Sequence, residues 1–222
     1  MSVRLTMMTA LTTLTVAAAA SMLLGGCASK PVEPAWRGNA GGALDSFTSE
    51  YLAGNSAMAA ADFARARVAM ASTGRADLVA HAELLRCAVR TASIDGGECA
   101  GFAPLAVDAT AAERAYAAYL AGRWQQGDAG LLPPQHQAIA GGAAGLPSVA
   151  DPLARLVAAG ALLQAGRLSP GDIDVAIETA SAQGWRRPLL AWLGVAAQRA
   201  RAAGDSDSVA RIERRMALVT SR

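Results

Sequence analysis

The side chains that could do acid–base or metal chemistry are few in this sequence, and they are widely spaced. There are two histidines, His81 and His136. Neither has a second histidine three or four residues away, so the spacing of a zinc site is missing, and we predict neither a metal nor a cofactor. His81 shares a helical face with Leu78 and Leu85, which predicts a packed or half-buried ring. His136 lies between two glutamines in an irregular segment and is expected to be solvated.

A carboxylate could still act alone, because some lytic peptidoglycan enzymes use a single glutamate on a helical fold. The conceivable acids are Glu83, Glu98, Glu113 and Glu178. Glu113 is explained as a capping partner, Glu98 lies beside a cysteine in a turn, and the other two have the spacing of helix-surface charges. No GxSxG elbow and no phosphate-binding GxxxxGK[ST] loop occurs. We therefore name no catalytic residue.

The stretch Trp185-Arg186-Arg187-Pro188 places an aromatic ring and two guanidinium groups at a connection between helices. An arginine over the Trp185 ring would form a cation–π pair, and such corners can be partner-binding sites. The alternative is that Trp185 closes the hydrophobic core while Arg186 and Arg187 are solvated. Both interpretations stay open.

The elements that must position these side chains are helices. From Leu44 onward, apolar residues recur at helical spacing, alanine is abundant and alternating β-branched runs are few. We predict an all-α fold of about eight antiparallel helices in stacked hairpins, either α-solenoid-like or closed into an irregular orthogonal bundle. The glycines expected to end the helices recur about every 20 residues: Gly54, Gly74, Gly96, Gly122, Gly145, Gly166, Gly184 and Gly204.

Local signals mark several helix starts. Thr110-Ala111-Ala112-Glu113 has the pattern of a capping box, and Ser169-Pro170 combines an N-cap with proline at the first helical position. Ser148 is expected to cap another helix, and Pro133-Pro134 to begin a short one. Trp192-Leu193-Gly194 is similar to tetratricopeptide-type hairpins, although the full residue pattern and the period of about 34 residues are missing.

The first 26 residues have the pattern of an export signal, with Arg4 before an apolar run and small residues at its end. The run ends in Leu24-Gly25-Gly26-Cys27, which resembles the lipobox of bacterial lipoproteins. The resemblance implies that a signal peptidase cuts before Cys27 and that this cysteine carries acyl chains such as palmitate. Ala28, where an Asp would favour the inner membrane, implies the outer membrane of a Gram-negative bacterium, with the domain facing the periplasm. An uncleaved membrane-spanning helix is the alternative.

Three segments follow from these patterns: a signal peptide over 1–26, a lipidated N-terminus and flexible tether over 27–42, and a helical domain over 43–222 with a possible sub-boundary near 123–147. The tether is rich in proline and glycine. Trp36 within it is expected either to dock on the domain or to lie at the lipid interface.

The charges nearly balance, with 20 basic and 18 acidic residues. This balance argues against nucleic acid or an anionic membrane face as the partner. Five arginines gather near the end, at positions 199, 201, 211, 214 and 215. Favourable interactions with helix C-termini explain them, and Asp205 and Asp207 weaken any basic patch.

With Cys27 lipidated, Cys87 and Cys99 remain, and in an exported protein we expect them to form a disulfide. The bridge would close a loop of about a dozen residues and stabilise the fold by roughly 2–3 kcal/mol. A redox or metal pair is the alternative, although the spacing is not CxxC.

The expected role is that of a non-catalytic outer-membrane lipoprotein, a helical scaffold or adaptor for an envelope protein partner. The membrane would be the second partner, through the N-terminal lipid. A peptidoglycan-acting enzyme that uses one glutamate and a periplasmic binder of a small ligand are the alternatives.

Overall fold

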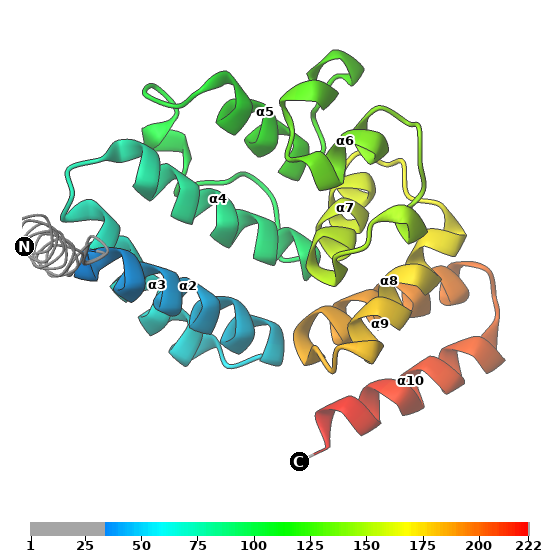
Figure 1. Cartoon of the computed structure of the whole chain (residues 1–222). Helices are drawn as coiled ribbons and strands as arrows, with labels where there is room; N and C mark the ends of the chain where they lie inside the picture. Colours follow the sequence, from blue (N-terminus) through cyan, green and yellow to red (C-terminus); the bar gives the residue numbers. More distant parts are fainter. Residues whose placement is uncertain (1–33, 222) are drawn as a thin grey trace, which may run out of the picture. The chain divides into compact units, whose positions relative to one another are not determined.

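The computed structural model describes residues 34–221, and over this range the secondary structure is helical without any strand (Figure 1). The all-α prediction is therefore confirmed. Nine α-helices are present in the described range: α2 (Ala35–Ala53), α3 (Ser56–Ala71), α4 (Ala76–Ala92), α5 (Ala111–Leu120), α6 (Pro134–Ala140), α7 (Pro152–Gln164), α8 (Pro170–Ala182), α9 (Arg186–Ala202) and α10 (Ser206–Thr220). Three short 3-10 helices connect them: η1 (Ala103–Leu105), η2 (Gln126–Leu131) and η3 (Leu146–Ser148).

Helix α2 begins well inside the segment that was predicted to be a flexible tether. It starts at Ala35, so residues 35–42 are helical and the prediction of a tether as far as 42 is wrong. Glycine disfavours a helix by about 1 kcal/mol relative to alanine, and the three glycines of this segment therefore suggested a loop. Packing outweighs this cost, because Ala40, Ala43 and Leu44 are buried and Trp36 packs against the same cluster.

Helix α4 lies between two hydrophobic clusters. One cluster joins α2 and α3 to α4 through Phe47, Phe63 and Val89. The larger cluster joins another face of α4 to the five helices from α5 to α9. Its fully buried side chains include Tyr119, Leu156 and Trp192. Residues 123–147 carry Trp124, Leu132, Ile139, Ala140 and Leu146 into this larger core, so the predicted sub-boundary there is wrong.

Helices that are distant in the sequence contact one another around the C-terminal end of α4. Helix α7 packs against α4, where Gly160 lies so close to the backbone of Thr91 that a Cβ atom would not fit. The Trp192 indole of α9 donates a hydrogen bond of 3.1 Å to the Ala92 carbonyl. Helix α9 also contacts α2 (Figure 1). In an open stack of hairpins each repeat contacts only its neighbours, so these contacts depart from that arrangement.

Most helices end at or near the glycines that were predicted to end them. Six of the eight glycines singled out in the sequence have a positive φ just after a helix: Gly54, Gly74, Gly122, Gly166, Gly184 and Gly204. At the end of α4, Ile94 takes this left-handed conformation instead of Gly96, and after α6 it is Gly142 instead of Gly145. A β-branched residue is strained there, and Ile94 offsets the strain by packing against the larger cluster.

The predicted helix starts are mostly confirmed. Thr110 and Ser169 each form a capping box, and α6 begins at Pro134. The expectation that Ser148 caps a helix is wrong, because Ser148 lies in η3 and Asp151 caps α7. The Asp151 carboxylate accepts the Ala154 amide at 2.6 Å, and proline follows it at the first helical position.

Candidate functional site

Helix α4, the start of α5 and the connection from η2 to α6 line an apolar groove of about 510 Å³. The apolar side chains that line it are Leu84, Leu85, Ala112, Tyr116, Leu131, Leu132 and Pro133, and the polar ones are His81, Glu113 and Gln135. Leu131 remains 44% exposed. A recess of this size, with mostly apolar walls and a few polar groups, has the features of a binding site.

Two local features of the sequence position the walls of the groove. On α4, His81, Leu84 and Leu85 are three and four residues apart and so point to one side of the helix. On α5, the capping box fixes Glu113, whose Oε2 accepts hydrogen bonds from the Thr110 amide and hydroxyl, each at 2.8 Å. The carboxylate therefore has a defined place beside the apolar walls.

A cluster of aromatic rings lies behind the groove. Tyr116 stacks on His136 with a centroid distance of 5.7 Å, and Tyr119 lies 5.0 Å from the same ring. His136 is only 1% exposed, so the prediction of a solvated ring is wrong. Burial lowers the pKa of His136 to about 4 and raises the pKa values of Tyr116 and Tyr119 above the usual range. The imidazole is therefore neutral at pH 7.

His81 also differs from its prediction, since its side chain is exposed and lines the groove. The stripe that it shares with Leu78 and Leu85 lies at the edge of the buried face of α4, where both leucines are only half-buried. The core-facing side of α4 instead contains Val79, Ala80 and Ala88. A helical stripe shows which side chains share a face, but not how far the neighbouring elements cover that face.

Glu83 was predicted to be a charge on the helix surface, and its burial is the largest departure from the predictions for the four glutamates. It is 4% exposed, and its two oxygens lie 3.0 Å from Arg67 Nε and 2.6 Å from Arg86 Nη2. The Arg86 guanidinium also lies 4.5 Å over the Phe63 ring. Gly101 covers the pair so closely that any Cβ atom would overlap it. The adjoining cavity of about 30 Å³ has room for no more than a few water molecules.

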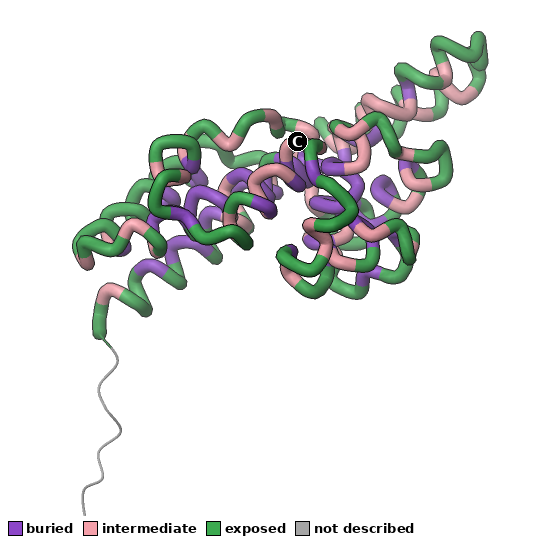
Figure 2. The backbone as a smooth tube through the Cα atoms, turned by 90° about the horizontal axis from the view of Figure 1, so that it is seen from above, coloured by how far each residue is buried: buried purple, intermediate pink, exposed green. Residues whose placement is uncertain are grey.

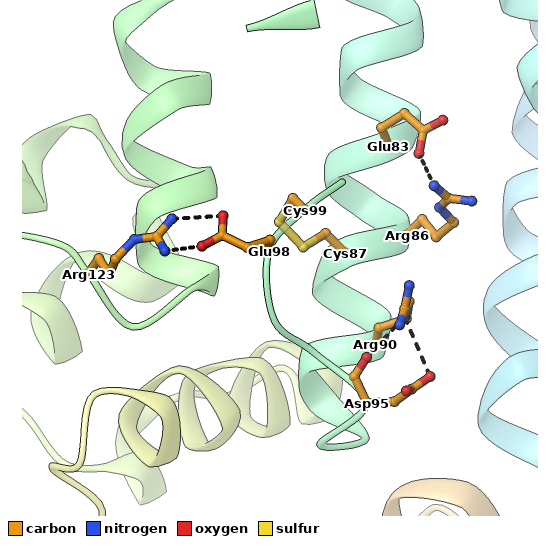
Figure 3. Close-up of a disulfide and its surroundings, with 8 residues drawn as sticks. All are labelled: Glu83, Arg86, Cys87, Arg90, Asp95, Glu98, Cys99 and Arg123. Carbon is orange, nitrogen blue, oxygen red and sulfur yellow. Dashed lines mark hydrogen bonds and ion pairs between the residues drawn. A yellow bond between two sulfur atoms is a disulfide. The ribbon is translucent and has the colours of Figure 1, made fainter. Parts of the chain in front are cut away.

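The other three glutamates have structural partners or lie at the surface. Glu98 pairs with Arg123, which holds the pKa of the carboxyl below its usual value (Figure 3). Glu178 is exposed on α8, as predicted. Glu113 caps α5, also as predicted. None of these arrangements has the free, partly desolvated carboxyl group that a general acid needs.

Cys87 and Cys99 form the predicted disulfide, with their Cα atoms 5.5 Å apart (Figure 3). Cys87 belongs to α4 and Cys99 to the loop that follows it. The bridge therefore holds this loop against its own helix, where Phe102 enters the larger core. Asp95, in the same loop, pairs with Arg90 and accepts a hydrogen bond from the Tyr51 hydroxyl.

The predicted partner-binding group is engaged within the chain. Arg187 donates hydrogen bonds to the Tyr51 carbonyl at 2.7 Å and to Ser56 Oγ at 2.6 Å. Its guanidinium lies 4.2 Å from the Tyr51 ring centroid, so the cation–π partner is Tyr51 and not Trp185. Trp185 is half-buried against both clusters, and Arg186 donates to the Val219 carbonyl at 3.3 Å. These contacts join α9 to the α2–α3 turn and to α10.

Sequence reasoning did not identify the groove, because its walls come from segments that are far apart in the chain. The one local signal was the apolar run Leu131-Leu132-Pro133 in a segment without helical periodicity. Such a run in a connection needs a surface to pack against, and here it packs toward α4 and α5.

Cys27 lies outside the described residues. Within residues 34–221, no helix is both long and apolar enough to cross a membrane, and no group of three His, Cys, Asp or Glu side chains has the arrangement of a metal site. Comparison of the chain with protein-family models, with curated proteins and with solved structures gave no match.

Proposed function

We propose that the protein is a lipid-anchored adaptor of the bacterial outer membrane, and that its α4–α5 groove binds an apolar segment of an envelope protein. The lipobox resemblance of Leu24-Gly25-Gly26-Cys27 supports the anchor, and Ala28 supports the outer membrane. The Cys87–Cys99 bridge is consistent with export, because disulfides persist in oxidising compartments.

The observation that carries the adaptor role is the apolar lining of the groove. A partially exposed Leu131 and a half-buried Tyr116 face a recess that an amphipathic segment could fill with side chains three and four residues apart. Glu113 is the one carboxylate in the lining, so the segment would gain from a basic residue beside its apolar anchors.

An enzyme built on one glutamate is less well supported. Both oxygens of the buried Glu83 lie next to arginines, and the cavity beside it is too small for a sugar. A small-ligand binder is the second candidate, because about 510 Å³ lies within the range of ligand pockets, roughly 300–1,000 Å³. A thermal-shift screen with apolar amines would favour this second candidate if one of them raised the melting temperature.

Crosslinking in cells followed by purification from solubilised membranes tests the adaptor proposal. We expect one protein to be recovered in stoichiometric amount with the natural chain and to be lost with Leu131→Asp, which puts a second carboxylate into the groove. Val68→Asp is the matched control, since Val68 is 70% exposed on α3 and does not line the groove. Equal recovery with both variants would refute the groove as the binding site.

The anchor is tested separately with Cys27→Ser. In cell fractionation, this variant should no longer appear in the outer-membrane fraction, because the acyl chains would be lost. Unchanged recovery in that fraction would contradict the lipid anchor.

A further inference from the structure

The charges of residues 35–221, which we call the helical unit, are unevenly distributed along the chain. Residues 35–185 carry ten arginines and fourteen acidic side chains, a formal charge of −4. Residues 186–221, which form α9 and α10, carry seven arginines and three acidic side chains, a formal charge of +4. The near-neutral total therefore conceals a basic hairpin, and charge asymmetry of this kind is typical of chains that meet an anionic surface.

The basic side chains of α10 gather on its outer face. Ile212, Met216 and Val219 pack against the larger core, while no residue of α10 is fully buried. Across the helical unit, the buried residues lie mainly on the inner sides of the helices (Figure 2). On the other side, Leu218 is 75% exposed. Arg215, Arg214 and Arg211 lie three, four and seven residues before it, so these three arginines and the exposed leucine share one face of the helix. We call Arg211, Arg214, Arg215 and Leu218 the α10 outer face.

The nearby acidic side chains are mostly engaged elsewhere. Glu213 pairs with Arg201 at 2.6 Å, and Asp205 caps α10 by accepting the Ser208 amide at 2.9 Å. Asp207 lies in the first turn, four residues before Arg211, and Asp205 also interacts electrostatically with Arg211. Arg211 donates to Ser208 Oγ at 2.8 Å, and the guanidinium groups of Arg214 and Arg215 have no hydrogen bond or ion pair with any described residue. The outer face therefore keeps a positive charge that the rest of the helical unit does not neutralise.

The mixture of side chains suits a lipid surface better than a purely polar one. Arginines at an interface pair with phosphate groups, and an exposed leucine among them can enter the boundary between headgroups and acyl chains. Helix α10 also lies on the opposite side of the helical unit from α5, a wall of the groove (Figure 1). Binding of a surface by α10 would leave the groove free for a partner.

The length of chain before α2 favours the membrane that carries the anchor. Because α2 begins at Ala35, the segment from the acylated cysteine to the residue before α2 is only eight residues long, 27–34. Eight residues span at most about 28 Å when fully extended. A short link of this kind gives a high effective concentration of lipid, so even a weak surface contact would be populated.

We propose that the α10 outer face binds the anionic phospholipid headgroups of the membrane in which the protein is anchored. This inference rests on the proposed lipid anchor, because the anchor determines which membrane α10 would contact. The binding itself comes from Arg211, Arg214, Arg215 and Leu218 and does not require the acyl chains.

Vesicle sedimentation with the chain from residue 27 onward, carrying Cys27→Ser, tests the contact without the lipid anchor. Vesicles of phosphatidylcholine alone are compared with vesicles that also contain phosphatidylglycerol. We expect binding only to the anionic vesicles, and we expect it to weaken as salt screens the charges. Changing Arg211, Arg214 and Arg215 to Gln should reduce affinity on the order of 100-fold, since each arginine near an anionic surface contributes about a fivefold gain.

A matched control removes the same amount of charge elsewhere. Arg65, Arg75 and Arg123 are exposed and lie outside α9 and α10, and their replacement by Gln should leave vesicle binding within about twofold. Leu218→Gln should weaken binding without changing its salt dependence.

Equal losses in the two triple variants, or equal binding to neutral vesicles, would overturn the inference. Salt-dependent binding to polyglutamate without binding to vesicles would also overturn it and would assign the face to an acidic protein. Failure of the anchor would appear instead in the fractionation of Cys27→Ser cells, which does not depend on α10.

Discussion

His136 couples the stability of the fold to pH through a single buried ring. Its pKa in the folded protein is about 4 because burial disfavours the charged form, whereas the unfolded value is near 6.5. Below pH 6.5 the unfolded chain therefore binds a proton that the folded chain does not, and stability falls as the pH decreases from 6.5 toward 4. The loss contributed by this one residue should reach about 2 kcal/mol at pH 5.

Urea denaturation at pH 7.5 and pH 5 measures this loss. His136→Phe retains a ring against Tyr119 but cannot be protonated, so its stability should change less between the two pH values than that of the natural protein, by about 2 kcal/mol. The carboxylates contribute to both proteins alike and cancel in the difference. Parallel pH dependence of the two proteins would contradict a depressed pKa at His136.

At the scale of the element, α2 shows a conflict between propensity and packing. Gly38, Gly41 and Gly42 each disfavour a helix, and a Cβ added at any of them would meet no atom within 4 Å. Gly41→Ala should therefore stabilise the protein by roughly 0.5–1 kcal/mol, as expected for an exposed helix interior. Thermal unfolding measures the change.

Gly160→Ala, where a Cβ would overlap the Thr91 backbone, should be destabilising. A Gly160→Ala variant more stable than the natural protein would contradict the close packing of α4 and α7.

Helix ends could be predicted from the sequence wherever a local interaction decides them. The capping boxes at Thr110 and Ser169 depend on side chains three residues apart, and both occur. The start of α2 could not be predicted in this way, because its stability comes from contacts with α3 and α4. Ile94 likewise takes the left-handed position at the end of α4 because the larger core holds its side chain. Local patterns do not contain this information.

At the scale of the whole molecule, side-chain exposure depends on which helices meet. The repeated helical pattern predicted the fold class, but it did not indicate that α9 would pack on both α2 and α4. Glu83 and His136 were predicted to be exposed, and both are buried by segments that are distant in sequence or irregular in pattern. The groove depends on the same kind of long-range packing. Placement of the candidate site was therefore beyond prediction from periodicity, although Tyr116, Glu113 and His81 could be assigned to helices.

Arg187 is the side chain that joins the first and last parts of the helical unit. Its two hydrogen bonds and its place over the Tyr51 ring link the start of α9 to the end of α2 and the start of α3. Loss of a charged donor from a half-buried site costs about 1–2 kcal/mol, and Arg187→Gln should reduce the free energy of unfolding by that amount. Hydrogen exchange should accelerate most in α2 and α3, because they lose a contact with α9 that lies outside their own hairpin.

Arg186→Gln is the matched control for this change. Arg186 is the preceding residue, carries the same charge and is exposed, and its one hydrogen bond joins it to Val219 at the end of α10. Its replacement should alter stability by less than about 0.5 kcal/mol and leave exchange in α2 and α3 unchanged. Arg187→Lys should be intermediate, because an ammonium keeps the charge but cannot both stack on Tyr51 and reach two acceptors. If both Gln variants accelerated exchange in α2 and α3 equally, general charge would explain the effect, and a specific link between α9 and the α2–α3 hairpin would be excluded.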